Sequence, residues 1–135
     1  MSFIHWTDSL SVGIESIDEQ HKILVEIINN LNEAMRNSET DQIISDIFQR
    51  MIGYTEIHFA FEENLFDRYG YEGSTAHKAK HVALIDTIQS LQQKLDEGDA
   101  RVGIEVMEFL KRWLTDHILK TDRDYAEFLV EKGVK

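Results

Sequence analysis

The stretches His58–Glu62 (HFAFE) and His77–His81 (HKAKH) decide the fold of this chain. Each stretch places two side chains that can bind a metal four residues apart, and four residues return an α-helix to the same face one turn later. A short glycine-containing break separates the two pairs, so they can face each other across a helical hairpin. The pattern therefore predicts paired helices with a metal site between them.

The composition of the 135-residue chain limits the class of protein to which it belongs. Without cysteine it has neither disulfides nor thiolate ligands, so imidazole and carboxylate groups must hold any metal. The formal charge of −11 argues against a nucleic-acid partner and favours a monomer. No apolar run is long enough to span a bilayer and no secretory leader is evident. We therefore expect a cytoplasmic protein with no membrane insertion.

Apolar periodicity predicts a non-helical arm followed by four amphipathic helices. The arm covers residues 1–15, where Leu10, Val12 and Ile14 alternate with polar residues as an extended segment would. Helices are expected over about 17–37, 42–69, 75–97 and 100–131. Long helices joined by short links, with no proline in the chain, favour an all-α fold. The sequence thus predicts a single domain, 1–135, built as an up-down-up-down four-helix bundle.

Several residues are candidates for helix ends. Ser16 and Glu19 have the spacing of a capping box for the first helix, and Asp41 is a candidate N-cap for the second. Gly70 is expected to cap the end of the second helix, and Asp99 to open the fourth.

Five of the six histidines fall on the expected inward faces of the helices, and only His5, in the arm, is expected to be structurally incidental. The inward-facing candidates are His21, the pair His58 and Glu62, the pair His77 and His81, and His117. One buried histidine is usually an ordinary core residue, but here every helix contributes a ligand-type side chain. Separate core imidazoles would each need a hydrogen-bond partner, whereas one metal centre satisfies them together. Histidine and carboxylate ligands do not by themselves fix the metal, because such a site can take iron, manganese, zinc or copper.

Together with further motifs, these residues resemble the hemerythrin family, in particular its bacterial single-domain members. The motifs that carry the resemblance are Asp18-Glu19-Gln20-His21, His58-Phe59-x-x-Glu62, His77-x-x-x-His81, Trp113-Leu114-x-x-His117-Ile118-x-x-x-Asp122, and the arm residues Trp6 and Val12-Gly13-Ile14. The resemblance covers almost the whole chain, and every ligand position of the family is filled.

The resemblance implies a non-haem di-iron centre with a bridging oxo or hydroxo group and dioxygen as its ligand. By position, one iron would be bound by His77, His81 and His117, and the other by His21 and His58. Glu62 and Asp122 would bridge the two ions. With the bridging group, the first iron then has six donors and the second has five, which leaves one position open for dioxygen.

Asp122 does not follow from helical periodicity. It lies five residues after His117, which on an ideal α-helix leaves the two side chains about 140° out of register. Thr121, four residues along, is a poor ligand, and Asp124, seven along, lies about 10 Å further up the axis. The resemblance therefore predicts a widened, π-like turn between His117 and Asp122.

The open position requires a pocket that admits a diatomic gas and excludes water. The candidate pocket residues are Leu24, Ile28, Phe59, Trp113, Leu114 and Ile118. Each of these side chains is equally suited to the ordinary core of a bundle, and both roles can hold at once.

The ligand set favours reversible oxygen binding over catalysis. Di-iron oxidases of the ferritin-like type use Glu-x-x-His motifs and a mainly carboxylate shell, and no glutamate in this chain has a histidine three residues later. The leading prediction is a non-enzymatic protein that stores oxygen or delivers it, for example to an oxygen-consuming enzyme. Two alternatives remain: an oxygen or redox sensor acting with a signalling partner, and a di-iron enzyme with peroxidase-like or nitric oxide chemistry.

Overall fold

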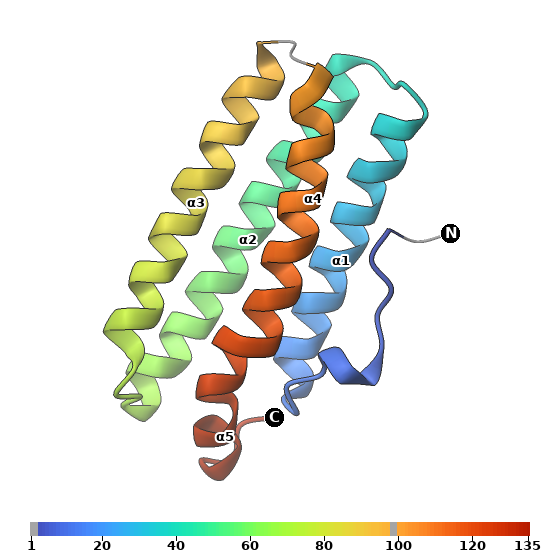
Figure 1. Cartoon of the computed structure of the whole chain (residues 1–135). Helices are drawn as coiled ribbons and strands as arrows, with labels where there is room; N and C mark the ends of the chain where they lie inside the picture. Colours follow the sequence, from blue (N-terminus) through green and yellow to red (C-terminus); the bar gives the residue numbers. More distant parts are fainter. Residues whose placement is uncertain (1–2, 98–99) are drawn as a thin grey trace.

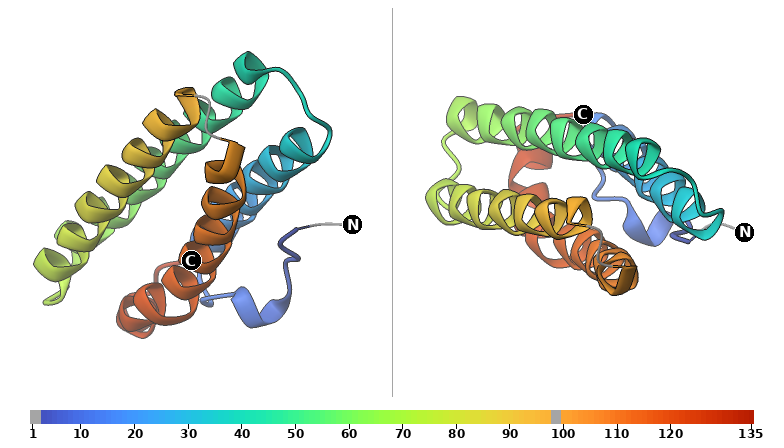
Figure 2. Two further views of the ribbon diagram at one scale, coloured as in Figure 1. Left: turned by 45° about the horizontal axis from the view of Figure 1, so that its top comes forward. Right: turned by 90° about the horizontal axis from the view of Figure 1, so that it is seen from above.

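Four long helical segments form a bundle in the computed structural model, which describes residues 3–97 and 100–135. The elements are α1 (Glu15–Arg36), α2 (Asp41–Tyr69), α3 (Ser74–Asp96), α4 (Ala100–Asp116), the π-helical η2 (His117–Asp122) and α5 (Arg123–Glu131). α1 and α3 each pack against both α2 and α4 (Figures 1 and 2). The predicted all-α, up-down-up-down bundle is confirmed, with α4, η2 and α5 following one another as its fourth segment.

The helix ends follow from local backbone chemistry. α2 ends where Gly70 adopts a left-handed conformation (φ 70°) and its N–H bonds back to the Phe66 carbonyl, as predicted for this glycine. The same helix opens at Thr40, whose side-chain oxygen accepts from the Ile43 N–H, so the predicted N-cap at Asp41 is wrong by one residue. The predicted opening of the fourth helix at Asp99 lies outside the described residues.

The predicted capping box at the start of α1 is also wrong. The helix begins at Glu15, so Ser16 already lies inside it, and no side chain caps its first turn. Instead the Asp18 carboxylate accepts hydrogen bonds from the Val12 N–H, at 2.9 Å, and from the Ser11 hydroxyl. An acidic side chain in the first helical turn thus holds the incoming arm rather than the helix's own N–H groups.

The N-terminal arm runs back along the bundle beside α1 (Figure 1). Its Ile4 forms two backbone hydrogen bonds with the Asn29 side chain of α1, at 2.7 and 2.9 Å. The arm also contains a short 3-10 helix, η1 (Asp8–Leu10), and Arg123 of α5 donates to the Ser9 carbonyl at 2.6 Å. These contacts fasten the arm to the middle of α1 and to the start of α5.

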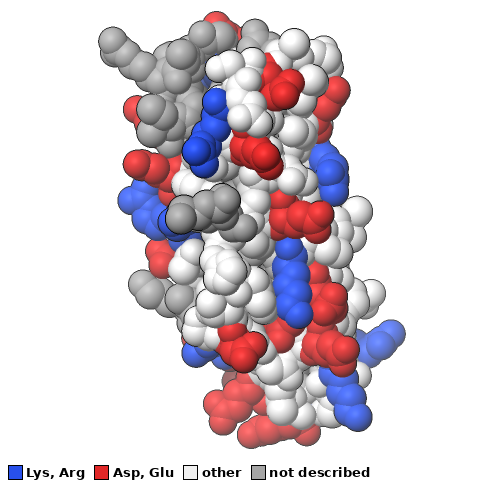
Figure 3. All heavy atoms as spheres, turned by 90° about the vertical axis from the view of Figure 1, so that its right-hand side faces the viewer, with Lys and Arg blue, Asp and Glu red and all other residues white. Residues whose placement is uncertain are grey.

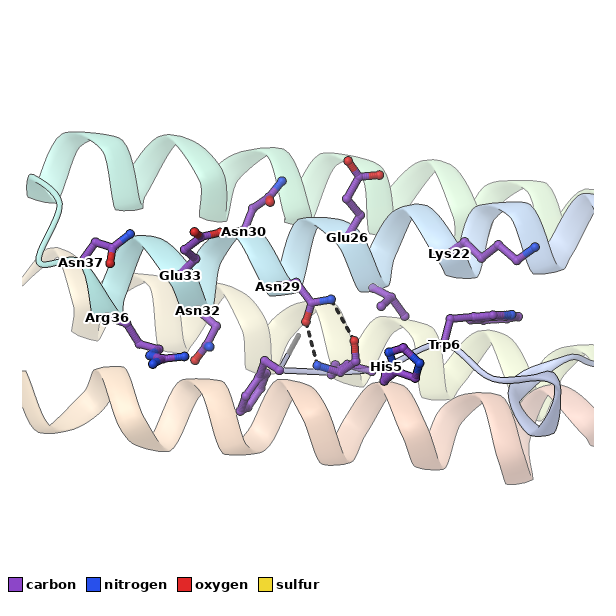
Figure 4. A pocket seen from close by; sticks show the side chains of 13 residues that line it. His5, Trp6, Lys22, Glu26, Asn29, Asn30, Asn32, Glu33, Arg36 and Asn37 are labelled. Carbon is purple, nitrogen blue, oxygen red and sulfur yellow. Dashed lines mark hydrogen bonds between the residues drawn. The ribbon is translucent and has the colours of Figure 1, made fainter. Parts of the chain in front are cut away.

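A cavity of about 640 Å³ lies between the arm and the outer face of α1 (Figure 4). Its walls are mainly polar, with asparagine, glutamate, lysine and arginine side chains from α1. Exposed His5 and the half-buried Trp6 close it from the arm, and Trp6 also packs against the bundle core. None of the other five histidines lines this cavity, which places His5 apart from them.

None of the described helices is long and apolar enough to cross a membrane. On the face shown in Figure 3, lysine and arginine side chains are interspersed with carboxylates, and acidic groups predominate at its lower end. That face therefore offers no continuous basic patch for a nucleic acid.

Candidate metal centre

The predicted ligands come together inside one end of the bundle. The start of α1, the end of α2, the start of α3 and the end of α4 all lie at the lower end in Figure 1. All seven side chains are buried, none more than 5% exposed: His21, His58, Glu62, His77, His81, His117 and Asp122. Burying two carboxylates in an apolar core is costly unless they are paired or bound to a metal.

The fourth helical segment contains a wider turn between His117 and Asp122, where a π-like turn was predicted. Residues His117–Asp122 form the π-helix η2 between α4 and α5, which confirms the π-like turn that the resemblance implied for this five-residue spacing. A π turn adds one residue to the helical repeat, so the two side chains at its ends point the same way. The His117 Nε2 and Asp122 Oδ1 atoms consequently lie 3.0 Å apart.

The two carboxylate oxygens of Glu62 face different groups of histidines. Oε1 lies 2.7 Å from the His58 Nε2 atom and 4.0 Å from the His21 Nε2 atom. Oε2 lies 3.2 Å from the His77 Nε2 atom and 3.1 Å from the His81 Nε2 atom. A carboxylate whose oxygens point to opposite sides in this way is placed to bridge two metal ions.

The two oxygens of Asp122, in η2, also face different groups of histidines. Its Oδ2 atom lies 2.8 Å from the His21 Nε2 atom. Its Oδ1 atom lies 3.0 Å from His117 Nε2 and 3.5 Å from His77 Nε2. The side chains thus form a two-histidine group, His21 and His58, and a three-histidine group, His77, His81 and His117, with both carboxylates between them.

The nitrogen and oxygen atoms of these side chains converge on two positions, and several of them have no hydrogen-bond partner among the described residues. Ligand atoms within 4.8 Å of one another form two sets, one of Glu62 with the three-histidine group and one of both carboxylates with the two-histidine group. Within the described chain, both Asp122 oxygens and the Nε2 atoms of His81 and His117 have no hydrogen-bond partner although they are buried. Buried lone pairs that converge without hydrogen bonds are the donor set of a metal site.

Without metal, the carboxylates and histidines of this cluster shift one another's pKa values. Burial raises the pKa of Glu62, but the charge and hydrogen bond of His58, a hydrogen bond with His77 and the nearby His81 ring hold it well below the usual range. Burial lowers the pKa of His77, but the neighbouring Asp122 and Glu62 carboxylates reverse this and raise it to about 9. Burial lowers the pKa of His81. At neutral pH the metal-free centre therefore holds ionised carboxylates beside a protonated His77.

Metal affinity should therefore rise with pH. A metal binds only neutral imidazole, so below pH 9 the metal must displace the His77 proton, and the affinity should increase about tenfold per pH unit between pH 7 and 9 for that proton. Anaerobic Fe²⁺ binding in weakly buffered solution with a pH indicator measures the proton release directly. His5→Ala, which changes the exposed sixth histidine, should release the same number. Affinity independent of pH in this window would contradict the protonation state of His77.

The candidate pocket residues are buried, but they do not all lie beside the two-histidine group. Leu24, Ile28, Leu114 and Ile118 are almost fully buried, and Trp113 is half-buried. The Phe59 ring stacks on His81 at 3.7 Å between centroids and lies 5.9 Å from His58, so it covers the three-histidine group more closely. The Trp113 ring lies 5.7 Å from His117. Leu24 and Ile28, which follow His21 on α1, remain the predicted lining beside the two-histidine group.

Two side chains that touch the ligands were not singled out from the sequence. The His58 Nδ1 atom lies 2.6 Å from the side-chain oxygen of Gln20, and the Tyr125 hydroxyl donates to Glu62 Oε1 at 3.0 Å. Gln20 directly precedes His21. Tyr125 lies three residues after Asp122, one turn further along the buried face. Adjacency to a ligand was the available signal in both cases.

Known proteins resemble this chain in sequence and in fold. The family model described as "Hemerythrin HHE cation binding domain" matches residues 12–129. The chain is 38% identical to a bacteriohemerythrin of Pseudomonas aeruginosa, over 94% of this chain and 82% of that protein, and 30% identical to one of Methylococcus capsulatus, over 96% and 98%. The crystal structure of a wild-type hemerythrin superposes with a TM-score of 0.85 at 29% identity, covering 93% of this chain and 97% of that one.

Proposed function

Because this chain belongs to the hemerythrin family, whose members are di-iron oxygen-binding proteins, we propose that its seven clustered side chains hold two iron ions that bind dioxygen reversibly. The observation that carries the proposal is the division of the Glu62 oxygens, one facing two histidines and the other facing two more. The site shows the same division at Asp122. A single ion would not need two carboxylates arranged in this way.

In this proposal, the protein would give the two ions different numbers of ligands. His77, His81 and His117 would supply three nitrogens to one ion, whereas His21 and His58 would supply two to the other. Both ions would share the oxygens of the two carboxylates. When bound, the iron pair supplies the electrons that dioxygen accepts on binding. The ion with fewer protein ligands would keep a position for oxygen, and the buried surroundings would exclude water from it.

We propose oxygen storage or delivery as the role of this centre, without turnover of a substrate. Five imidazoles and two carboxylates give the ions less negative charge than a carboxylate-rich shell would, which favours reversible binding. A sensor role with a signalling partner and an enzymatic role with peroxide or nitric oxide are the alternatives. The cytoplasmic location, the monomeric state and delivery to an oxygen-consuming enzyme stay predictions.

An anaerobic titration followed by oxygen cycling tests the proposal. The reduced protein is loaded with Fe²⁺, the iron per chain is counted, and the visible spectrum is followed while oxygen is admitted and removed repeatedly. We expect two irons per chain and a spectrum that returns over many cycles. Immediate irreversible oxidation would contradict reversible binding, and turnover of added peroxide or nitric oxide would favour the enzymatic alternative.

A matched pair of leucines tests the predicted oxygen pocket. Leu24 and Leu31 are both almost fully buried on α1, three and ten residues after His21, and so about 4.5 and 15 Å along the helix axis. Either substitution by alanine should cost about 2–5 kcal/mol of folding free energy. Only Leu24→Ala should also speed autoxidation of the oxygenated protein, because it opens space beside the two-histidine group. Equal autoxidation rates in the two variants would remove Leu24 from the pocket.

A further inference from the structure

Gln20 forms a hydrogen bond with the imidazole nitrogen of His58 that points away from the centre. Its Nε2 atom faces the centre, 2.7 Å from Glu62 Oε1 and 3.1 Å from His21 Nε2. Its other nitrogen, Nδ1, lies 2.6 Å from the Gln20 side-chain oxygen, which is an acceptor. The proton of the neutral ring therefore resides on Nδ1, which leaves the lone pair of Nε2 directed at the metal position.

The carboxylate of Glu62 is held in a similar way by Tyr125. The phenol hydroxyl donates to Oε1 at 3.0 Å, and Tyr125 is fully buried. Its ring is fixed by neighbours on both sides, with centroids 5.0 Å from Phe66 and 5.3 Å from His77. Because the ring cannot turn away, the hydroxyl fixes which oxygen of Glu62 points to which group of histidines.

Both contacts act on the two-histidine side of the centre. Oε1, which Tyr125 binds, faces His58, whereas Oε2 faces His77 and His81. In the described part of the chain, the outer nitrogen of His81 has no hydrogen bond, and its nearest carboxylate, that of Glu63, is 3.8 Å away. On the two-histidine side, the outer nitrogen of His21 likewise has no hydrogen bond among the described residues, so His58 and Glu62 are the ligands held there.

We propose that Gln20 and Tyr125 are positioning residues for the metal ion at the two-histidine group, and that they set its affinity without touching it. The inference rests on the proposed function, since it assigns roles toward a bound metal. The site with fewer protein ligands depends most on having each ligand pre-oriented. Removing a partner that orients a ligand typically lowers metal affinity by about 10- to 100-fold, and here the loss should fall on one ion of the two.

Four variants separate positioning from general stability. Gln20→Leu removes the acceptor for His58, and Gln20→Glu restores one. Tyr125→Phe removes only the hydroxyl and leaves the ring to fill its place in the core. Tyr54→Phe is the control, because Tyr54 is a half-buried tyrosine of α2 packed against the core, with no hydrogen bond to any proposed ligand among the described contacts. Far-UV circular dichroism and thermal melting of the iron-free proteins verify that each variant folds.

Anaerobic Fe²⁺ titration against a competing chromophoric chelator measures the two affinities. We expect wild type, Tyr54→Phe and Gln20→Glu to bind two ions tightly. Gln20→Leu and Tyr125→Phe should bind one ion tightly and the second at least about tenfold more weakly. In the iron-free protein, ¹⁵N NMR of the imidazoles should show a slowly exchanging His58 Nδ1 proton in wild type that exchanges faster in Gln20→Leu.

The outcomes distinguish this inference from the function on which it rests. If wild type binds two ions and both variants bind them with wild-type affinities, the positioning role is overturned while the di-iron proposal stands. Equal weakening of both ions would also overturn it, because the effect would not be confined to the two-histidine site. Wild type binding fewer than two ions would overturn both, even if the NMR signal confirmed the contact in the iron-free protein.

Discussion

Glu62→Gln should abolish tight binding of both metal ions. The wild-type carboxylate presents an oxygen to each group of histidines, 2.7 Å from His58 on one side and 3.1 Å from His81 on the other. A glutamine of the same shape has one oxygen and one NH₂ group, and the NH₂ group is a donor that cannot bind a cation. One ion therefore loses a ligand, and both lose a shared negative charge. We expect each affinity to fall by at least about 100-fold.

Glu63→Gln provides the matched control for this prediction. Glu63 is the next residue of α2 and also lies near a ligand, with a carboxylate oxygen 3.8 Å from the outer nitrogen of His81. Its side chain is 30% exposed and belongs to neither set of converging donor atoms. Iron per chain after anaerobic loading and desalting should be two for Glu63→Gln and near zero for Glu62→Gln. Two retained ions in Glu62→Gln would show that the carboxylate does not bridge them.

Helical periodicity predicted most of the clustered side chains because most of the proposed ligands lie on regular helices. His58 with Glu62 and His77 with His81 lie one turn apart on α2 and α3, and each pair is buried on the inward face. His21 and His117 follow the same apolar stripes. Burial of ligand-type side chains on all four segments is therefore a consequence of spacing that the sequence displays directly.

Asp122 could not be found in that way, since its position depends on a departure from the α-helical repeat. The π-helix at His117–Asp122 is a backbone feature without a sequence signal of its own, and only the resemblance to a family pointed to the aspartate. Gln20 and Tyr125 were missed for another reason. Their roles depend on side chains of other helices, His58 and Glu62, that are distant in sequence and meet them only in the packed bundle.

The errors at the helix starts have a similar cause. Ser16 and Glu19 have the spacing of a capping box, but the arm approaches α1 closely enough for Asp18 to bind its backbone instead. Thr40 and Asp41 are both good N-cap residues, and local sequence does not decide between neighbours. The contact between Asp18 and the arm settled the first case, whereas the Thr40 side chain bonds to the Ile43 N–H of its own first turn.

Iron loading should raise the melting temperature of the protein by about 20 °C. Metal ions that bind the folded chain and not the unfolded one stabilise it by mass action, about 2.7 kcal/mol for each ion at a free concentration 100 times its Kd. For a chain of this size, 1 kcal/mol corresponds to about 4 °C. The iron-free protein should still fold, because its carboxylates are paired with histidines such as His58 and His77. Anaerobic calorimetry with and without Fe²⁺ measures the difference.

His21→Ala should halve this stabilisation. His21 belongs to the two-histidine group alone, with its Nε2 atom 2.8 Å from Asp122 Oδ2, so its loss weakens one ion and leaves the ligands of the other in place. Each variant is compared with its own iron-free form, so any direct effect of the substitution on folding cancels. His5→Ala, in the arm, should keep the full increase. An undiminished increase in His21→Ala would mean that the iron-dependent stability comes from the three-histidine site alone, because two independent ions must contribute separate increments to the folded state.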